Sequence, residues 1–210
     1  MLVHNLRWLA ACGITDIAIN LHHLGEQIES LVGDGSRFGV SVRYSKEPEL
    51  LGTAGAVAAL GDWLEDGPFL VAYGDNRYEF DLGKLICDHE TNLGVATLAV
   101  FSLVTHSHSG IAGGKIELDS SQRILRFIEG RPAPTLDLVN AGCFVLDPLV
   151  LSCIPAVRPA DFGKDVFAVL LREHKILCGH LIDGSCLGID TPEALAAAQA
   201  LLRKEEGVTG

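Results

Sequence analysis

A continuous apolar run at residues 69–73, Phe-Leu-Val-Ala-Tyr, constrains the fold more than any other feature of this sequence. Such a run is typical of a strand that helices cover on both faces, because neither side of that strand meets water. Further strand-like segments lie at residues 16–20, 40–44 and 95–103, and segments of helical periodicity separate them. This alternation predicts an α/β fold with a Rossmann-like, doubly wound and mostly parallel sheet.

The length of 210 residues is typical of one domain. Helices are expected at residues 2–10, 24–32, 53–64, 81–90 and 161–173, with a last helix that starts at Thr191-Pro192. After residue 104 the strand-like segments are at residues 115–118, 124–128, 138–146, 176–182 and 185–189. We therefore expect a body over residues 1–104, a small β-rich insertion within 105–190, and a C-terminal helix in 191–210.

The chain opens on a helix, whereas a doubly wound domain normally opens on a strand followed by a glycine-rich turn. A first strand and its phosphate loop are therefore expected to be missing, which leaves a gap in the sheet. Each buried backbone group without a partner costs roughly 1–3 kcal/mol. We expect the isolated chain to aggregate or to pair with another chain, so a homo-oligomer is one outcome.

Composition excludes several classes of protein. Lys and Arg total 16 against 27 Asp and Glu, and the formal net charge of -11 repels the phosphate backbone of nucleic acids. No apolar run reaches the ~18 residues that a membrane span needs. The six cysteines are scattered and show no C-x-x-C spacing, which indicates reduced thiols in a cytoplasmic protein.

The first candidate site is the segment from Glu47 to Ala56, which reads Glu-Pro-Glu-Leu-Leu-Gly-Thr-Ala-Gly-Ala. Small residues leave the backbone bare at the start of a helix, where amides can approach a base or a phosphate closely. The alternative is a tight strand-to-helix turn in which the small residues serve close packing.

The second candidate is Gly74-Asp75-Asn76 after the apolar run. Ligands of open α/β sheets bind outside the carboxyl ends of strands, so the Asp75 carboxylate is well placed to bind Mg²⁺. Gly74 keeps the backbone beside it open to a ligand. The alternative is a type I turn with Asp near its start.

The third candidate joins Glu129 and Arg131 with Asn140. Glu129 and Asn140 offer acceptors for hydroxyl groups, and Arg131 offers a planar cation for a phosphate. Taken singly, each is also an ordinary residue of a surface loop. Asp190 either approaches a metal or precedes the last helix as a cap.

Other polar groups are assigned structural roles. Asp161 and Asp165 stand at the start of an expected helix, where caps and dipole partners are common. The histidines at residues 22–23 and at 106 and 108 lack further ligands nearby in sequence, so we interpret them as loop residues.

Taken together and in this order, the motifs resemble those of the sugar-1-phosphate nucleotidyltransferases along essentially the whole chain. The combination of Leu-Gly-Thr-Ala-Gly-Ala at residues 51–56 with Gly-Asp-Asn at 74–76 is the most specific part of the resemblance. The resemblance implies that a nucleotide contacts Glu47, Leu51, Gly52, Thr53, Ala54, Gly55 and Gly74. It also implies that Asp75 binds Mg²⁺ and that Glu129, Arg131, Asn140 and Gly142 line a pocket for a sugar phosphate.

Three departures from the family pattern stand out. The family's opening motif, G-G-x-G-T-R-L-x-P-L, is absent, and that loop wraps the triphosphate. Where the family has Glu-Lys-Pro, this chain reads Glu-Gly-Arg-Pro at residues 129–132, so the lysine for the sugar phosphate is replaced or displaced. The family's Asp-Ile-Gly-Thr-Pro reads Gly-Ile-Asp-Thr-Pro at residues 188–192, so Asp190, two residues further along the same strand face, becomes the second metal candidate.

The resemblance implies the reaction of an NTP with a sugar-1-phosphate to give an NDP-sugar and pyrophosphate, with Mg²⁺ on Asp75 and Asp190. The segment at residues 51–56 looks most like that of guanylyltransferases acting on mannose- or heptose-1-phosphate, with uridylyl or thymidylyl transfer as alternatives. Two other hypotheses stay open: a non-catalytic, nucleotide-sugar-binding homologue, and an enzyme that lacks its N-terminal part.

Overall fold

The computed structural model describes residues 1–105, 110–111, 113–189 and 191–205. The expectations for Asp190 and for the histidines at 106 and 108 lie outside these residues. Among the described residues, no helix combines the length and the apolar character that crossing a membrane requires.

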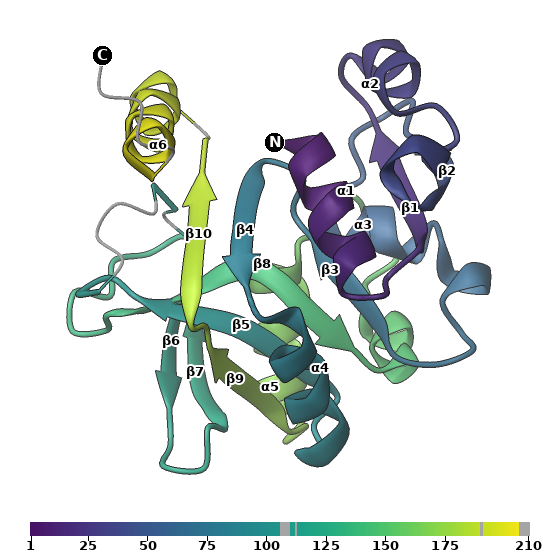
Figure 1. Ribbon diagram of the computed structural model, residues 1–210. Helices are drawn as coiled ribbons and strands as arrows, with labels where there is room; N and C mark the ends of the chain where they lie inside the picture. The colour runs from purple at the N-terminus through teal and green to yellow at the C-terminus, as the bar shows by residue number, and fades with distance from the viewer. Residues whose placement is uncertain (106–109, 112, 190, 206–210) are drawn as a thin grey trace.

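A six-stranded sheet forms the body of the molecule (Figure 1). Its strands are β3 (Phe69–Ala72), β5 (Ala96–Ser102), β6 (Lys115–Leu118), β7 (Ile124–Ile128), β8 (Leu138–Leu146) and β9 (Leu177–Leu181). Their order is β7-β6-β8-β5-β9, and β3 pairs with β8. The ladders of β8 with β3, β5 and β6 are antiparallel and that of β5 with β9 is parallel, so β3, β5, β6 and β9 point the same way.

Two smaller sheets flank this body. Strands β1 (Asp16–Leu21) and β2 (Ser41–Lys46) form a parallel pair. Strands β4 (Asn76–Phe80) and β10 (Gly184–Gly188) form an antiparallel pair. Within the described residues no ladder joins β1 to β3, so the β1–β2 pair stands apart from the six-stranded sheet.

Helices cover both faces of the six-stranded sheet, with α4 in front of it and α5 behind it in Figure 1. The helices are α1 (Leu2–Ala11), α2 (Gly25–Val32), α3 (Thr53–Ala58), α4 (Leu82–Thr91), α5 (Ala168–Arg172) and α6 (Pro192–Glu205). Shorter helical turns lie at Ser36–Phe38, Gly61–Trp63 and Pro148–Cys153, and a π-helix at Phe162–Phe167 leads into α5. Gly13 follows α1 with a φ of 83°, the left-handed conformation expected after a helix.

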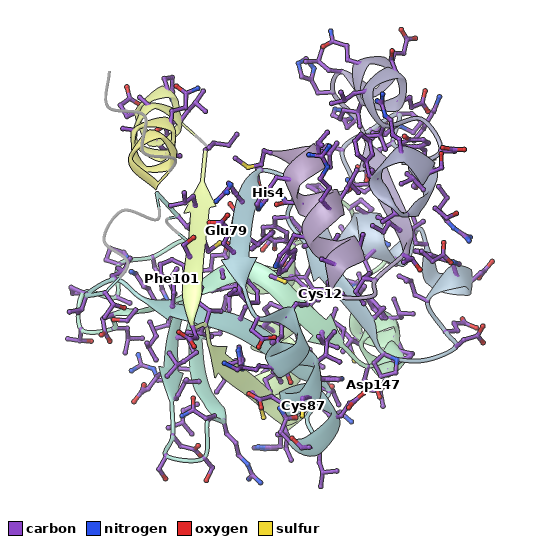
Figure 2. All side chains as sticks on the ribbon, in the orientation of Figure 1. His4, Cys12, Glu79, Cys87, Phe101 and Asp147 are labelled. Carbon is purple, nitrogen blue, oxygen red and sulfur yellow. The ribbon has the colours of Figure 1, made fainter. Side chains whose placement is uncertain are left out.

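Helix α1 connects the β1–β2 pair to the body by packing against β4. Asn5 donates from Nδ2 to the carbonyl oxygen of Asn76 at 2.6 Å, and Trp8 donates from Nε1 to the carbonyl oxygen of Phe80 at 3.1 Å. The Trp8 ring also stacks on Tyr78, with 5.3 Å between ring centroids. Figure 2 shows His4, on α1, beside β4.

The α/β fold class predicted from the apolar pattern is confirmed, and most expected elements lie within a few residues of their predicted bounds. Three details differ. Helix α3 ends at Ala58 instead of Leu64, and a separate turn follows at Gly61–Trp63. Strand β4 was not predicted. The expected β-rich part is no separate layer, because β8 pairs with both β3 and β5 inside the main sheet.

Candidate active site

A cavity of about 1140 Å³ lies between β1 and β3. On one side Asp16, Ile17, Ala18 and Asn20 of β1 line it. On the other side it is lined by β3, by the turn that follows β3, and by residues of β8. The cavity therefore occupies the space between two strand edges that no ladder joins in the described part of the chain.

The turn after β3 carries Gly74 and Asp75, and both line the cavity. The amide of Tyr73 donates to the carbonyl oxygen of Gly142 at 2.9 Å, which fixes the start of the turn. Asn76 ends the turn: its buried side chain donates from Nδ2 to the carbonyl oxygen of Ala141 at 3.0 Å. Asp75 is exposed between these two anchors, as expected for a carboxylate that meets a ligand.

Tyr78, on β4, holds the same turn in place through its hydroxyl. Its hydroxyl donates to the carbonyl oxygen of Gly142 at 2.7 Å and accepts from the amide of Tyr73 at 3.0 Å. The side chain is fully buried, and burial raises the pKa of Tyr78 well above its ordinary value, so the hydroxyl stays protonated and able to donate. Tyr78 therefore ties the turn that carries Asp75 to Gly142 on β8.

Asn140 and Gly142 on β8 line the cavity beside this turn. The amide of Gly142 donates to Oδ1 of Asn140 at 3.1 Å, so the Asn140 side chain is held by its own strand. Gly142 has a φ of 70°, and a Cβ there would stand 2.7 Å from the Tyr73 ring. Only glycine fits this position, because both the backbone conformation and the close ring exclude a side chain.

Glu129, just after β7, also lines the cavity, and the π-helix packs against it. Burial and the nearby Asp161 carboxylate raise the pKa of Glu129, while the Lys164 ammonium lowers it. Asp161 caps the π-helix by accepting from the amides of Gly163 at 2.9 Å and Lys164 at 3.1 Å, as predicted. Thr53 donates to Asp161 at 3.0 Å and so ties this segment to α3.

The glycine segment before α3 packs against the chain itself. A Cβ on Gly52 would lie 2.8 Å from the Ala160 nitrogen, and one on Gly55 would lie 2.7 Å from the Arg158 side chain. The amides of Ala54 and Gly55 both donate to the carbonyl oxygen of Ala160, at 2.9 and 3.2 Å. In this structure these small residues allow close packing, and the amides of Ala54 and Gly55 already have a partner within the chain.

Glu47 has a structural role in the same segment. It is buried, and its carboxylate accepts from Asn20 at 3.0 Å and from the amide of Leu51 at 3.2 Å. Glu47 thus joins the end of β1 to the loop that leads into α3.

The structure gathers part of the expected site around one cavity. Its described lining includes Thr53, Gly74, Asp75, Glu129, Asn140 and Gly142. Glu47, Leu51, Gly52, Ala54 and Gly55 lie in the neighbouring segment and outside that lining. Arg131 is exposed and also outside it.

The sequence motifs did not include Tyr78 and Asn5, and they included Asn76 only as the last residue of Gly74-Asp75-Asn76. The alternation of the aromatic Tyr78 and Phe80 with the charged Arg77 and Glu79 was a readable signal for the strand β4. The hydrogen bond between Asn5 and Asn76 joins residues 71 positions apart, and no local pattern predicts such a pairing.

The cavity is acidic. Its described lining contains the carboxylates of Asp16, Asp66, Asp75 and Glu129 and neither lysine nor arginine. Among the described residues, no group of three or more His, Cys, Asp or Glu side chains forms a metal cage. The exposed Asp75 carboxylate at the strand end still fits Mg²⁺, which is commonly held by one or two carboxylates together with substrate phosphates and water.

Comparisons with known proteins agree with this fold. The sequence profile of the nucleotidyl transferase family matches residues 1–205. A mannose-1-phosphate guanylyltransferase of Mycobacterium tuberculosis is 29% identical over 200 residues, 95% of this chain and 55% of that protein. A mannose-1-phosphate guanyltransferase of Eremothecium gossypii is 29% identical over 204 residues, 96% of this chain and 55% of that protein.

Solved structures share the fold. A Bacillus anthracis protein in complex with a sucrose superposes with a TM-score of 0.81 at 23% identity, covering 96% of this chain and 82% of that one. HddC from Yersinia pseudotuberculosis, solved with GMP-PN, gives a TM-score of 0.74 at 19% identity over 95% and 84% of the two chains.

An α/β sheet with a cavity at the carboxyl end of a strand is the usual ligand-binding arrangement of open α/β proteins. Within that class, the chain belongs to the nucleotidyl transferase family, since the family profile matches nearly its full length. The chain spans about half the length of the curated relatives it matches.

Proposed function

We propose that this chain takes part in the transfer of a nucleotidyl group from an NTP to a sugar-1-phosphate, with GTP and mannose-1-phosphate as the favoured pair. The observation that carries the proposal is the single cavity that brings Asp75 together with Glu129, Asn140 and Gly142. The curated relatives named as mannose-1-phosphate guanylyltransferases support the choice of substrates.

In this reaction a phosphate oxygen of the sugar-1-phosphate attacks the α-phosphorus of the NTP. A new P–O bond forms as the bond from the α-phosphorus to the bridging oxygen breaks, and pyrophosphate leaves with that electron pair. The chain's part is to position the two substrates. Glu129 and Asn140 accept hydrogen bonds from sugar hydroxyls. The Tyr78 hydroxyl holds the Asp75 turn against β8, which carries Asn140, through its bonds to Tyr73 and Gly142.

Mg²⁺ would be held by Asp75, with Asp190 as the second candidate from the sequence. When bound, a divalent cation neutralises charge on the phosphates. Asp75 suits this role because its turn is anchored on both sides, by Tyr73 and by Asn76, while the carboxylate itself is exposed to the cavity.

A second candidate function is the binding of a nucleotide sugar without catalysis. The observation that favours it is the absence of lysine and arginine from the described lining of the cavity, because a triphosphate normally needs cations close to its charges. Heptose-1-phosphate as the sugar, and uridylyl or thymidylyl transfer, are the alternative substrates.

The test compares wild type with Asp75→Asn and with Asp66→Asn, a matched control that removes another exposed carboxylate from the same cavity. We expect calorimetry to show Mg²⁺-dependent binding of GDP-mannose in wild type and in the Asp66 variant, and none in the Asp75 variant. Melting temperatures should stay nearly equal, because Asp75 is exposed. UDP-glucose should bind more weakly than GDP-mannose.

Pyrophosphate release from GTP and mannose-1-phosphate separates the two candidates. Release supports nucleotidyl transfer, whereas binding of GDP-mannose without release supports the non-catalytic alternative. Wild-type protein that binds no nucleotide sugar contradicts both candidates.

A further inference from the structure

The end of the cavity that is proposed to bind the sugar phosphate carries negative charge. Glu129 and Asp75 both line it, and its described lining holds neither lysine nor arginine. If the proposed function holds, a sugar-1-phosphate brings a phosphate group to this end. Carboxylates repel a phosphate, so a cation has to reach it from the rim of the cavity.

Lys164 lies beside Glu129, a residue that lines the cavity. Position 130, next along the chain, is a glycine in the left-handed conformation, with a φ of 71°. A Cβ at this position would lie 3.6 Å from Cε of Lys164, so the end of the lysine side chain lies in contact distance of position 130. The family pattern has a lysine directly after the residue that corresponds to Glu129, and this chain has Gly130 there. Lys164, from another segment, lies next to that position.

The backbone that carries Lys164 is fixed on two sides. Asp161 accepts from the Lys164 amide at 3.1 Å, which holds the first turn of the π-helix. Gly163 packs so closely on the Glu129 carboxylate that a side chain at Gly163 would overlap it. Lys164 therefore starts from a fixed point beside Glu129, while its own side chain is exposed and able to reach a ligand.

The effect of Lys164 on the pKa of Glu129 agrees with this placement of the lysine. The Lys164 charge lowers the pKa of Glu129, against the rise caused by burial and by Asp161. An ammonium close enough to act on the Glu129 carboxylate is also close to the ligand that Glu129 contacts.

We propose that Lys164 binds the phosphate of the sugar-1-phosphate, in the place that the sequence alone assigned to Arg131. This inference rests on the proposed function. Lys164 and Arg131 are both exposed and outside the described lining of the cavity. Lys164 is favoured because it follows Gly163, which packs on the carboxylate of the lining residue Glu129, and because its charge acts on that carboxylate. A lysine ammonium acts as a compact point charge, which suits a phosphate reached from one side.

The test uses three single substitutions that each remove one positive charge. Lys164→Gln tests the proposal and Arg131→Gln tests the assignment made from sequence. Lys84→Gln is the matched control, since Lys84 is an exposed lysine on α4 with the Asp183 carboxylate at 3.5 Å. NMR titrations with mannose-1-phosphate and with mannose, which detect millimolar binding, give the affinity of each variant, and melting temperatures check folding.

We expect Lys164→Gln to weaken the binding of mannose-1-phosphate about tenfold, the usual scale for one hydrogen bond to a charged group. Binding of mannose, which has no phosphate, should be unchanged, and so should both affinities in the other two variants. Unchanged affinity in Lys164→Gln, or a loss in Arg131→Gln alone, overturns the assignment. Wild-type protein that binds neither ligand contradicts the proposed function itself, and this inference with it.

Discussion

The two sides of the cavity differ in how much of their chain is buried. On the N-terminal side, β1 buries only Leu21 fully, and the buried cluster beneath it consists of Leu6, Val32 and Val40. On the body side, β8 buries eight of its nine residues. That side rests on a large cluster around Phe144, in which the rings of Phe162 and Phe167 pack edge-on against it.

This difference in burial indicates which side of the cavity holds the candidate site residues in place. Asp75, Glu129, Asn140 and Gly142 all belong to the body side. The N-terminal side contributes β1 and reaches the body through α1. Local stability follows buried apolar contacts, so we expect the N-terminal side to open more readily than the site residues move.

The largest expected effect comes from paired truncations in the two cores. Phe144→Ala should lower the free energy of unfolding by about 3–5 kcal/mol, because Phe144 is fully buried among other rings. Val32→Ala removes two methyl groups from a small cluster and should cost roughly 1.5 kcal/mol. Urea unfolding of both variants measures the difference, and equal losses would contradict the contrast drawn between the two sides.

A smaller effect is expected at the contact between the two sides. Asn5→Ala removes the buried 2.6 Å hydrogen bond that Asn5 donates to the carbonyl oxygen of Asn76 and the bond that it accepts from the amide of Tyr78 at 3.5 Å. The loss should be about 1–3 kcal/mol. Amide hydrogen exchange should speed up in α1 and β1 and stay unchanged in β5.

Gln27→Ala, which truncates an exposed side chain on α2, is the control for Asn5→Ala and should leave exchange unchanged. Faster exchange in β5 of the Asn5 variant would show that the two sides unfold as one unit.

Features that depend on local interactions were predicted from the sequence, and features that depend on contacts between distant residues were not. Apolar periodicity is local, so it gave β3, β5 and the α/β class, and the cap by Asp161 was predicted from its position before a helix. The packing of Gly52 on Ala160 joins residues more than a hundred positions apart. Composition could not choose between packing and ligand binding there, because both need small residues.

The same distinction between local and long-range interactions applies to the candidate site. Asp75 follows the apolar strand β3, and that position alone predicted its place in a cavity. The neighbourhood of Lys164 and Gly130 depends on how the π-helix packs on β7, which the sequence does not show.

The smallest expected effect is a pH-dependent gain of stability in Glu129→Gln. Burial and Asp161 raise the pKa of Glu129 in the folded protein, so the folded state binds its proton more tightly than the unfolded state does. Wild-type stability is therefore reduced as the pH rises through the unfolded and then the folded pKa. Glutamine should raise the melting temperature at pH 7 and leave it nearly unchanged at pH 3.

Asp137→Asn, at an exposed carboxylate outside the cavity lining, is the control for the Glu129 measurement. A Glu129 variant that melts lower than wild type at pH 7 would show that the carboxylate stabilises the fold.

The placement of the two tryptophans gives the molecule its own optical reporters. Trp8 stacks on Tyr78, where α1 meets β4, so its emission follows the separation of the two sides. Trp63 lines the cavity under the Arg43 guanidinium, which lies 4.2 Å from the ring centroid. With Trp63 replaced by Phe, fluorescence records the opening of the N-terminal side; with Trp8 replaced, it records a ligand entering the cavity.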